Sequence, residues 1–168
     1  MSKRTALFPG TFDPVTHGHV DLVRRGLVLF DRVVVGVVAD QGKPLFPAAD
    51  RVRLLEQVLE AEGLAAGKRV TVAPFQGLVV DAAKSHGAVC LLRGIRGALD
   101  WDYEMRMAFA NRDLAPDVDT VFLPPSASTA PISASLVREV ARLGGAVDAW
   151  VHPLVVKAIE ARLTASGG

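Results

Sequence analysis

The stretch Arg32–Val38, R-V-V-V-G-V-V, decides the fold class of this 168-residue chain. It is almost wholly apolar and rich in β-branched valine, which is the composition of a strand buried on both faces of a sheet. Runs of the same kind occur at Thr5–Phe8, Arg69–Ala73, Ala88–Leu92 and Asp119–Leu123. Because strands covered on both faces are typical of parallel sheets, these runs predict a five-stranded parallel sheet.

Amphipathic stretches with helical spacing alternate with these strands. The predicted helices are Gly18–Phe30, Ala48–Glu62, Val79–His86, Trp101–Leu114, Ser133–Leu143 and Pro153–Leu163. Strict alternation predicts an α/β fold in which one doubly wound sheet carries helices on both faces. No repeat, linker or shift in composition divides the chain, so we expect residues 1–168 to form a single domain, with a frayed tail at residues 164–168.

The composition restricts the partners and the compartment. Half of the residues are hydrophobic and the net charge is +1, so the sequence predicts neither a nucleic-acid nor a membrane partner. The apolar run Val33–Ala39 is far shorter than the roughly 20 residues of a membrane span, and the first residues lack the apolar core of a signal peptide. We therefore expect a cytoplasmic protein. Cys90, the only cysteine, excludes an intrachain disulfide and favours a buried thiol over a nucleophile.

The loops after the strands are where an open α/β sheet binds ligands. They contain neither G-x-x-x-x-G-K-[ST] nor G-x-G-x-x-G, which excludes a P-loop and the dinucleotide fingerprint. Helix N-termini and nearby cations remain as the means of binding a phosphate.

His17 and His19 are the most conspicuous residues of the first loop. Two histidines at i and i+2 do not share a helix face, and no carboxylate or cysteine stands at a ligand-like spacing, so a transition-metal site is disfavoured. In the first turn of a helix His19 could bind a phosphoryl oxygen, or it could be a capping or core residue. The residues alone leave both readings open.

Three blocks of sequence together resemble one enzyme family. Gly10–His19, G-T-F-D-P-V-T-H-G-H, and Ile132–Arg138, I-S-A-S-L-V-R, resemble two motifs of the nucleotidyltransferase superfamily. Leu91–Pro116, which contains R-G-I-R and D-W-D-Y-E-M, is similar to the middle block of bacterial phosphopantetheine adenylyltransferases. The likeness covers nearly the whole chain, with the three blocks in the order of that family.

The resemblance implies an activity, an assembly and a fold. It implies a homohexamer of Rossmann-like subunits that transfers the adenylyl group of ATP to 4′-phosphopantetheine, giving dephospho-coenzyme A and pyrophosphate. The acceptor phosphate would attack the α-phosphorus directly, without a covalent intermediate. Mg2+ would accompany ATP, with no protein side chain named as its ligand. The register of the first motif gives the catalytic role to His19 and a variable position to His17.

The resemblance also implies the site residues. His19 would stabilise the transition state, and the 4′-phosphopantetheine site would contain Thr11, Lys43, Val79 and Arg93. The ATP site would contain Thr11, Phe12, His19, Gly94, Ile95, Arg96, Glu104, Thr129, Ala130, Pro131, Ile132, Ser133, Ala134 and Ser135. The residues alone also allow Lys43 and Arg93 to be surface cations and Ser133 or Ser135 to be helix caps.

Two other functions stay open at this point. A superfamily member could use a different acceptor, such as nicotinamide mononucleotide or a phosphorylated alcohol. The segment Thr129–Ser135, T-A-P-I-S-A-S, lacks an aromatic residue and two serines of the family pattern. The absence of these three motif residues is the only support for a nucleotide-binding module that lacks catalysis.

Overall fold

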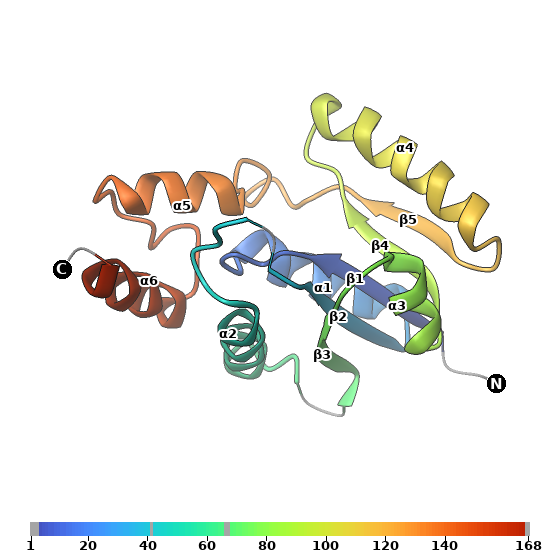
Figure 1. Cartoon of the computed structure of the whole chain (residues 1–168), viewed down its shortest axis with the longest axis horizontal. Helices are drawn as coiled ribbons and strands as arrows, with labels where there is room; N and C mark the ends of the chain where they lie inside the picture. The colour runs from blue at the N-terminus through green and yellow to red at the C-terminus, as the bar shows by residue number, and fades with distance from the viewer. Residues whose placement is uncertain (1–3, 41, 66–67, 167–168) are drawn as a thin grey trace.

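The computed structural model describes residues 4–40, 42–65 and 68–166 and has one sheet of five parallel strands (Figure 1). The strands are β1 (Thr5–Gly10), β2 (Arg32–Val38), β3 (Val70–Phe75), β4 (Ala88–Gly94) and β5 (Asp119–Leu123). The helices are α1 (His17–Leu29), α2 (Ala48–Ala61), α3 (Val79–Ser85), α4 (Ala98–Leu114), α5 (Ala134–Arg142) and α6 (Pro153–Ser166).

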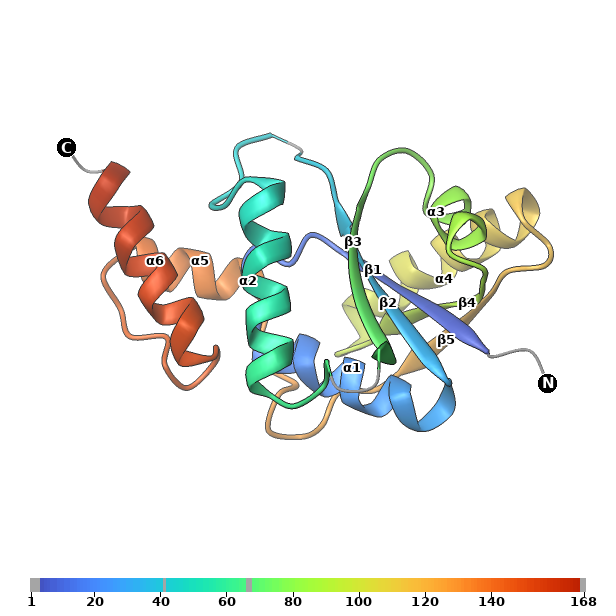
Figure 2. The same ribbon diagram turned by 90° about the horizontal axis from the view of Figure 1, so that it is seen from below.

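The sheet is doubly wound, as the sequence predicts. The strand order is β3-β2-β1-β4-β5, so the chain moves outward from β1 in one direction and then returns to build the other half. Helices α1 and α2 pack on one face, whereas α3 and α4 pack on the other (Figure 2). The order reverses between β1 and β4, and this is the place where an open α/β sheet forms a ligand crevice.

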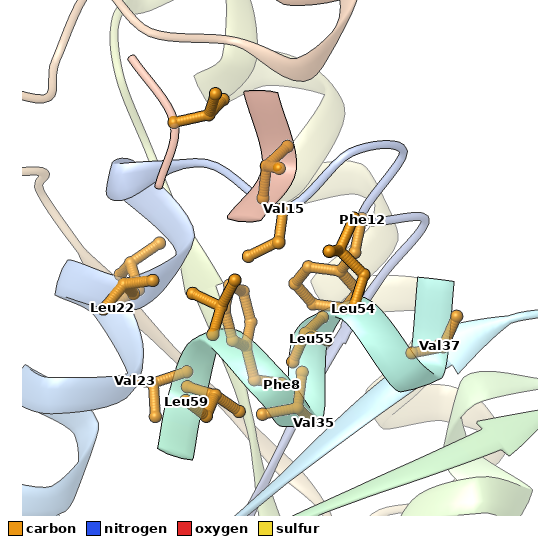
Figure 3. Packing of buried hydrophobic residues seen from close by; sticks show 14 of the residues in the cluster. Phe8, Phe12, Val15, Leu22, Val23, Val35, Val37, Leu54, Leu55 and Leu59 are labelled. Carbon is orange, nitrogen blue, oxygen red and sulfur yellow. The ribbon is translucent and has the colours of Figure 1, made fainter. Parts of the chain in front are cut away.

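Alternation along β1 and β2 produces two apolar cores. Ala6, Phe8 and Val35 face α1 and α2, whereas Leu7 and Val34 face α3. The larger core includes the side chains that α1 and α2 direct at the sheet, among them Val23, Leu54, Leu55 and Leu59 (Figure 3). Full burial of each such side chain contributes about 1.5–3 kcal/mol, so the two cores hold the layers together.

The predicted elements are all present, and the differences lie at their ends. β2 and β5 have the predicted bounds, but β1 and β4 each continue two residues further. They do so because their ends pair with the neighbouring strands, as Gly10 pairs with Val37 and Gly94 with Leu123. β3 runs from Val70 through Pro74 to Phe75, and an edge strand tolerates proline, which has no N–H to donate, because only one side of the strand must pair.

Two helices differ more from prediction. α4 begins at Ala98 instead of Trp101, so Asp100 lies in its first turn, where the helix dipole favours an acid. α6 continues to Ser166, which corrects the predicted frayed tail for residues 164–166. The Thr164 hydroxyl donates to the Glu160 carbonyl, one turn earlier in this helix. Residues 167 and 168 lie outside the described part of the chain.

A buried arginine on α2 joins the loops at the carboxyl edge of the sheet. The Arg51 side chain is 2% exposed. Its guanidinium donates to the carbonyls of Thr11, Val38 and Phe46 over 2.5 to 3.0 Å. It also forms an ion pair with Asp40 at 2.5 Å. One side chain therefore fixes the ends of β1 and β2 and the start of α2 relative to one another.

Asp13 fixes the same edge from the other side. Its carboxylate accepts hydrogen bonds from the backbone N–H groups of Leu45 and Phe46 at 2.8 and 2.9 Å. Its carbonyl accepts from the Arg138 guanidinium on α5. The loop after β1 is thereby tied both to the segment before α2 and to α5.

Replacing Arg51 by methionine is expected to lower the free energy of unfolding by about 3 kcal/mol, because three carbonyls lose their donor and buried orphan acceptors cost about 1–3 kcal/mol each. Arg53→Met is the matched control, since that side chain lies on the same helix but is 71% exposed. Urea titration should give a change below about 0.5 kcal/mol for the control. Equal effects of the two substitutions would contradict the role of Arg51.

Candidate active site

A cavity of about 670 Å3 opens at the carboxyl edge of the sheet, where the strand order reverses. Its wall is built from the loops after β1, β4 and β5, the inner side of α4 and the start of α5. This volume is within the range of small-molecule sites, about 300–1,000 Å3. The cavity thus has the place and the size that a nucleotide with a second substrate requires.

Most residues that the sequence predicts for the site line this cavity. They are Thr11, Phe12, His19, Val79, Arg93, Gly94, Arg96, Glu104, Thr129, Ile132, Ser133, Ala134 and Ser135. Lys43, Ile95, Ala130 and Pro131 are not among the lining residues. Lys43 is exposed in the loop that follows β2, so the structure does not bring it to the cavity. The binding roles of these four residues stay predictions.

His19 is held rigidly at the start of α1. Thr16 caps the helix and exchanges two hydrogen bonds with His19. The Thr16 hydroxyl accepts from the His19 N–H at 3.4 Å, and the Thr16 N–H donates to Nδ1 of His19 at 3.0 Å. The imidazole also packs against the Phe12 ring, with centroids 4.9 Å apart and planes at 70°. The hydrogen bonds to Thr16 and the contact with the Phe12 ring together fix the orientation of the imidazole.

These contacts determine the protonation of His19. A backbone N–H can only donate, so Nδ1 accepts and the proton of the neutral ring resides on Nε2. Burial, with a smaller contribution from the Arg96 charge, lowers the pKa of His19 from 6.5 to about 4. At neutral pH the side chain is therefore a neutral donor through Nε2–H.

The two histidines do not form a metal site. Nδ1 of His19 is already bound to the Thr16 N–H, and His17 does not line the cavity. Among residues 4–40, 42–65 and 68–166, no group of three or more His, Cys, Asp or Glu side chains is arranged to hold a metal ion. Of the two histidines, only His19 is among the residues that line the cavity.

Arg93 and Glu104 form one unit, although the sequence assigns them to different substrates. Nε and an Nη of Arg93 donate to the two carboxylate oxygens of Glu104 at 2.7 and 2.5 Å. The second Nη donates to the Pro9 carbonyl at 2.9 Å. Each Nη still has a second N–H, and the arginine lines the cavity. Glu104 therefore holds a guanidinium whose remaining N–H groups suit a phosphate.

The other charges of the cavity are paired in a similar way. Nε of Arg96 donates to Asp100 at 3.1 Å, and the Arg138 guanidinium donates to the Asp13 carbonyl. Asp100 and Glu104 are the acids of the described lining, and each is bound to an arginine. This set does not fit a resident metal held by protein carboxylates.

The start of α5 forms the third polar element. The Ser133 hydroxyl accepts from the Leu136 N–H at 3.1 Å, so Ser133 is the helix cap that the residue pattern allows. The Ser133 and Ser135 hydroxyls lie 3.1 Å apart, and both residues line the cavity. Free N–H groups at a helix N-terminus and two hydroxyls make a suitable place for phosphate oxygens.

Sequence reasoning missed part of the wall that α4 supplies. Tyr103, Met107 and Asn111 line the cavity beside Phe75 and Val79. Asn111 is 8% exposed, and among the described residues its side-chain amide has no hydrogen-bond partner. The spacing of these three residues, four apart along a helix, was the signal that could have revealed them. They add an apolar wall with one amide to the charged end of the cavity.

Comparison with known proteins gives matches in sequence and in structure. The model of the cytidylyltransferase-like family matches residues 7–140. A phosphopantetheine adenylyltransferase of Agrobacterium fabrum is 47% identical over 94% of this chain and 97% of its own length. One of Thiobacillus denitrificans is 46% identical over 95% and 97%.

The similarity in structure extends to distant proteins. A bifunctional NMN adenylyltransferase/ADP ribose pyrophosphatase from Francisella tularensis has a TM-score of 0.68 at 15% identity, covering 89% of this chain and 45% of the other. The same protein complexed with AMP and a manganese ion has a TM-score of 0.63. At this identity the likeness extends to the fold alone.

The lowered pKa of His19 predicts that acid destabilises the protein. The unfolded chain binds a proton near 6.5 and the folded chain only near 4, so the free energy of unfolding should fall as the pH drops through this window. His19→Asn should remove that part of the pH dependence. Urea titrations from neutral pH down to the lower limit of the window would test this. Parallel curves for the variant and the parent chain would refute it.

Proposed function

Since this chain belongs to the phosphopantetheine adenylyltransferases of the cytidylyltransferase-like family, we infer that it transfers the adenylyl group of ATP to 4′-phosphopantetheine. The products are dephospho-coenzyme A and pyrophosphate. The observation that carries the chemistry is a cavity that is lined by Arg93, Arg96 and Arg138, by the neutral donor His19, and by apolar side chains of α3 and α4.

The reaction needs no side-chain nucleophile. A terminal oxygen of the acceptor phosphate attacks the α-phosphorus of ATP, and the bond from that phosphorus to the leaving pyrophosphate breaks. Cys90 does not line the cavity, and burial raises its pKa to about 11, so this thiol is unsuited to a covalent step. Catalysis then consists of aligning two phosphates and stabilising the charge that develops between them.

Each polar element of the cavity has a role in this proposal. Nε2–H of the neutral His19 imidazole donates a hydrogen bond to an α-phosphate oxygen. Arg93, oriented by Glu104, binds the acceptor phosphate. The α5 start and Arg138 also line the cavity and suit the β- and γ-phosphates.

Mg2+ enters this proposal as part of the ATP substrate. Glu104 and Asp100 are engaged with Arg93 and Arg96, so the phosphate oxygens are the natural ligands of the ion. When bound there, the cation would neutralise phosphate charge. The AMP and manganese of the Francisella tularensis protein are compatible with an ion that accompanies the nucleotide.

The site also favours particular partners. ATP and 4′-phosphopantetheine are the small-molecule ligands, and Phe75, Val79 and Met107 offer the pantetheine arm an apolar wall. No described helix is both long and apolar enough to cross a membrane. We place the enzyme in the cytoplasm, where its substrates would be found.

We expect the purified protein, given ATP, Mg2+ and 4′-phosphopantetheine, to release pyrophosphate and form dephospho-coenzyme A. Nicotinamide mononucleotide at the same concentration should give less than about a hundredth of that rate, because the arginine-bound acceptor phosphate must also place its arm on the apolar wall. A coupled pyrophosphate assay measures the rate with each acceptor, and mass spectrometry identifies the products. Tight binding without pyrophosphate release would instead favour a module that has lost catalysis.

The adjacent histidines supply a matched control for the chemistry. His19→Ala should lower kcat by about 10²–10³, the usual cost of one well-placed oxyanion donor. His17→Ala should change kcat less than about twofold, since His17 does not line the cavity and its N–H bond to the Trp150 carbonyl involves only the backbone. A fully active His19→Ala variant would refute the assigned role while leaving the activity itself in place.

The assembly we propose is a homohexamer. Its structural support is the number of large apolar side chains on α4 that are each at least half exposed: Trp101, Tyr103, Phe109 and Leu114. A cluster of large apolar side chains on one helix is typical of a contact surface. Native mass spectrometry should give six times the mass of the 17.8 kDa chain. A monomer at micromolar concentration would contradict the proposal.

A further inference from the structure

A carboxylate on α1 joins that helix to the loop after β5. The Asp21 side chain accepts from the Ser126 N–H at 3.2 Å and from the Ser126 hydroxyl at 2.9 Å. Arg25, one helical turn later, lies 3.8 Å from Asp21 and donates to the Pro124 carbonyl. The loop is thus held by a side chain on each side of one turn of α1.

Ser126 is the first member of a chain of hydrogen bonds along this loop. Its carbonyl accepts from the N–H groups of Thr129 and Ala130, both at 2.9 Å. The Thr129 carbonyl in turn accepts from the Ile132 N–H at 3.0 Å. Ile132 precedes Ser133, the cap of α5. A fixed Ser126 therefore sets the position of the segment that ends at the α5 phosphate site.

The same helix holds the catalytic histidine. Asp21 is two residues beyond His19, and the loop crosses the start of the helix, because a Cβ at Gly18 would lie 3.7 Å from the Thr129 carbonyl oxygen. Pro125, Thr129 and Ile132 of this loop line the cavity. One rigid helix thus carries both the donor to the α-phosphate and the anchor of the loop that faces the remaining phosphates.

We propose that Asp21 is a positioning residue for ATP: through Ser126 it sets residues 126–133 at the correct distance from His19. Asp21 and Ser126 lie outside the roles that the sequence motifs imply. Asp21 is 19% exposed, so its hydrogen bonds are partly shielded from water. The proposal rests on the adenylyl transfer inferred above and assigns a residue that does not itself touch the substrate.

Loss of the anchor should affect one substrate and spare the other. Without Asp21 the loop samples several positions, and the apparent affinity for ATP falls in proportion to the competent fraction. Asp21→Ala should raise the KM for ATP about tenfold, which corresponds to a competent fraction of about one tenth. The KM for 4′-phosphopantetheine should change less than about twofold, because Arg93 and Glu104 lie on β4 and α4.

Conservative variants separate positioning from simple loss of stability. Asp21→Asn keeps an oxygen that can accept from Ser126 and should recover at least half of the lost ATP affinity. Ser126→Ala removes the hydroxyl bonds but keeps the backbone bond, and it should give a smaller effect than Asp21→Ala. The double variant should be no worse than Asp21→Ala, because both substitutions break the same contact.

Asp102→Ala is the matched control. Asp102 pairs with Arg106 at i, i+4, as Asp21 pairs with Arg25, but it is exposed and does not line the cavity. Calorimetry with a non-hydrolysable ATP analogue, alongside steady-state kinetics, gives a measure that does not need turnover. If both KM values rise together, or if only the melting temperature falls, Asp21 is merely structural and the proposal is wrong. A parent chain that binds ATP but makes no dephospho-coenzyme A would overturn the proposed function instead.

Discussion

The buried guanidinium of Arg51 is the interaction on which the site depends. Taking a charged group out of water is costly unless every donor finds a partner, and here the carbonyls of Thr11, Val38 and Phe46 and the carboxylate of Asp40 supply them. The hydrogen bonds offset the cost of burying the charge only when all these groups lie around the guanidinium. The ends of β1 and β2 and the start of α2 therefore have one compatible arrangement. The floor of the cavity is therefore fixed before any ligand binds.

Helix α1 carries His19, which lines the cavity above this floor. Thr16 and Phe12 orient His19, which lines the cavity, and burial keeps its imidazole neutral with the proton on Nε2. Arg93 and Arg96 carry their own counter-ions in Glu104 and Asp100. The donors of the cavity are thus held in place before a ligand binds, which is the preorganisation that the proposed reaction requires.

The comparisons separate what the fold provides from what the side chains provide. The Francisella tularensis protein has a similar fold at 15% identity, and as an NMN adenylyltransferase it acts on another acceptor. The doubly wound sheet therefore supplies the crevice, and the choice of acceptor belongs to the residues that line it. In this chain the residues that we propose for this choice are Arg93, which Glu104 holds, and an α4 wall that includes Met107 and Asn111.

The sequence by itself determined the sheet, because five strand-like apolar runs alternate with stretches of helical spacing. The resemblance of three motifs pointed to His19, Arg93 and the α5 start, and the structure brings these residues to one cavity. The sequence could not show that Arg93 and Glu104 form one ion pair, since they lie 11 residues apart and meet only when α4 packs beside β4. It left the protonation of His19 open, because the pKa depends on burial and on the Thr16 N–H. Contacts between segments distant in sequence, such as Arg51 with Thr11 and Asp21 with Ser126, depend on how the layers pack, and only the tertiary structure decided them.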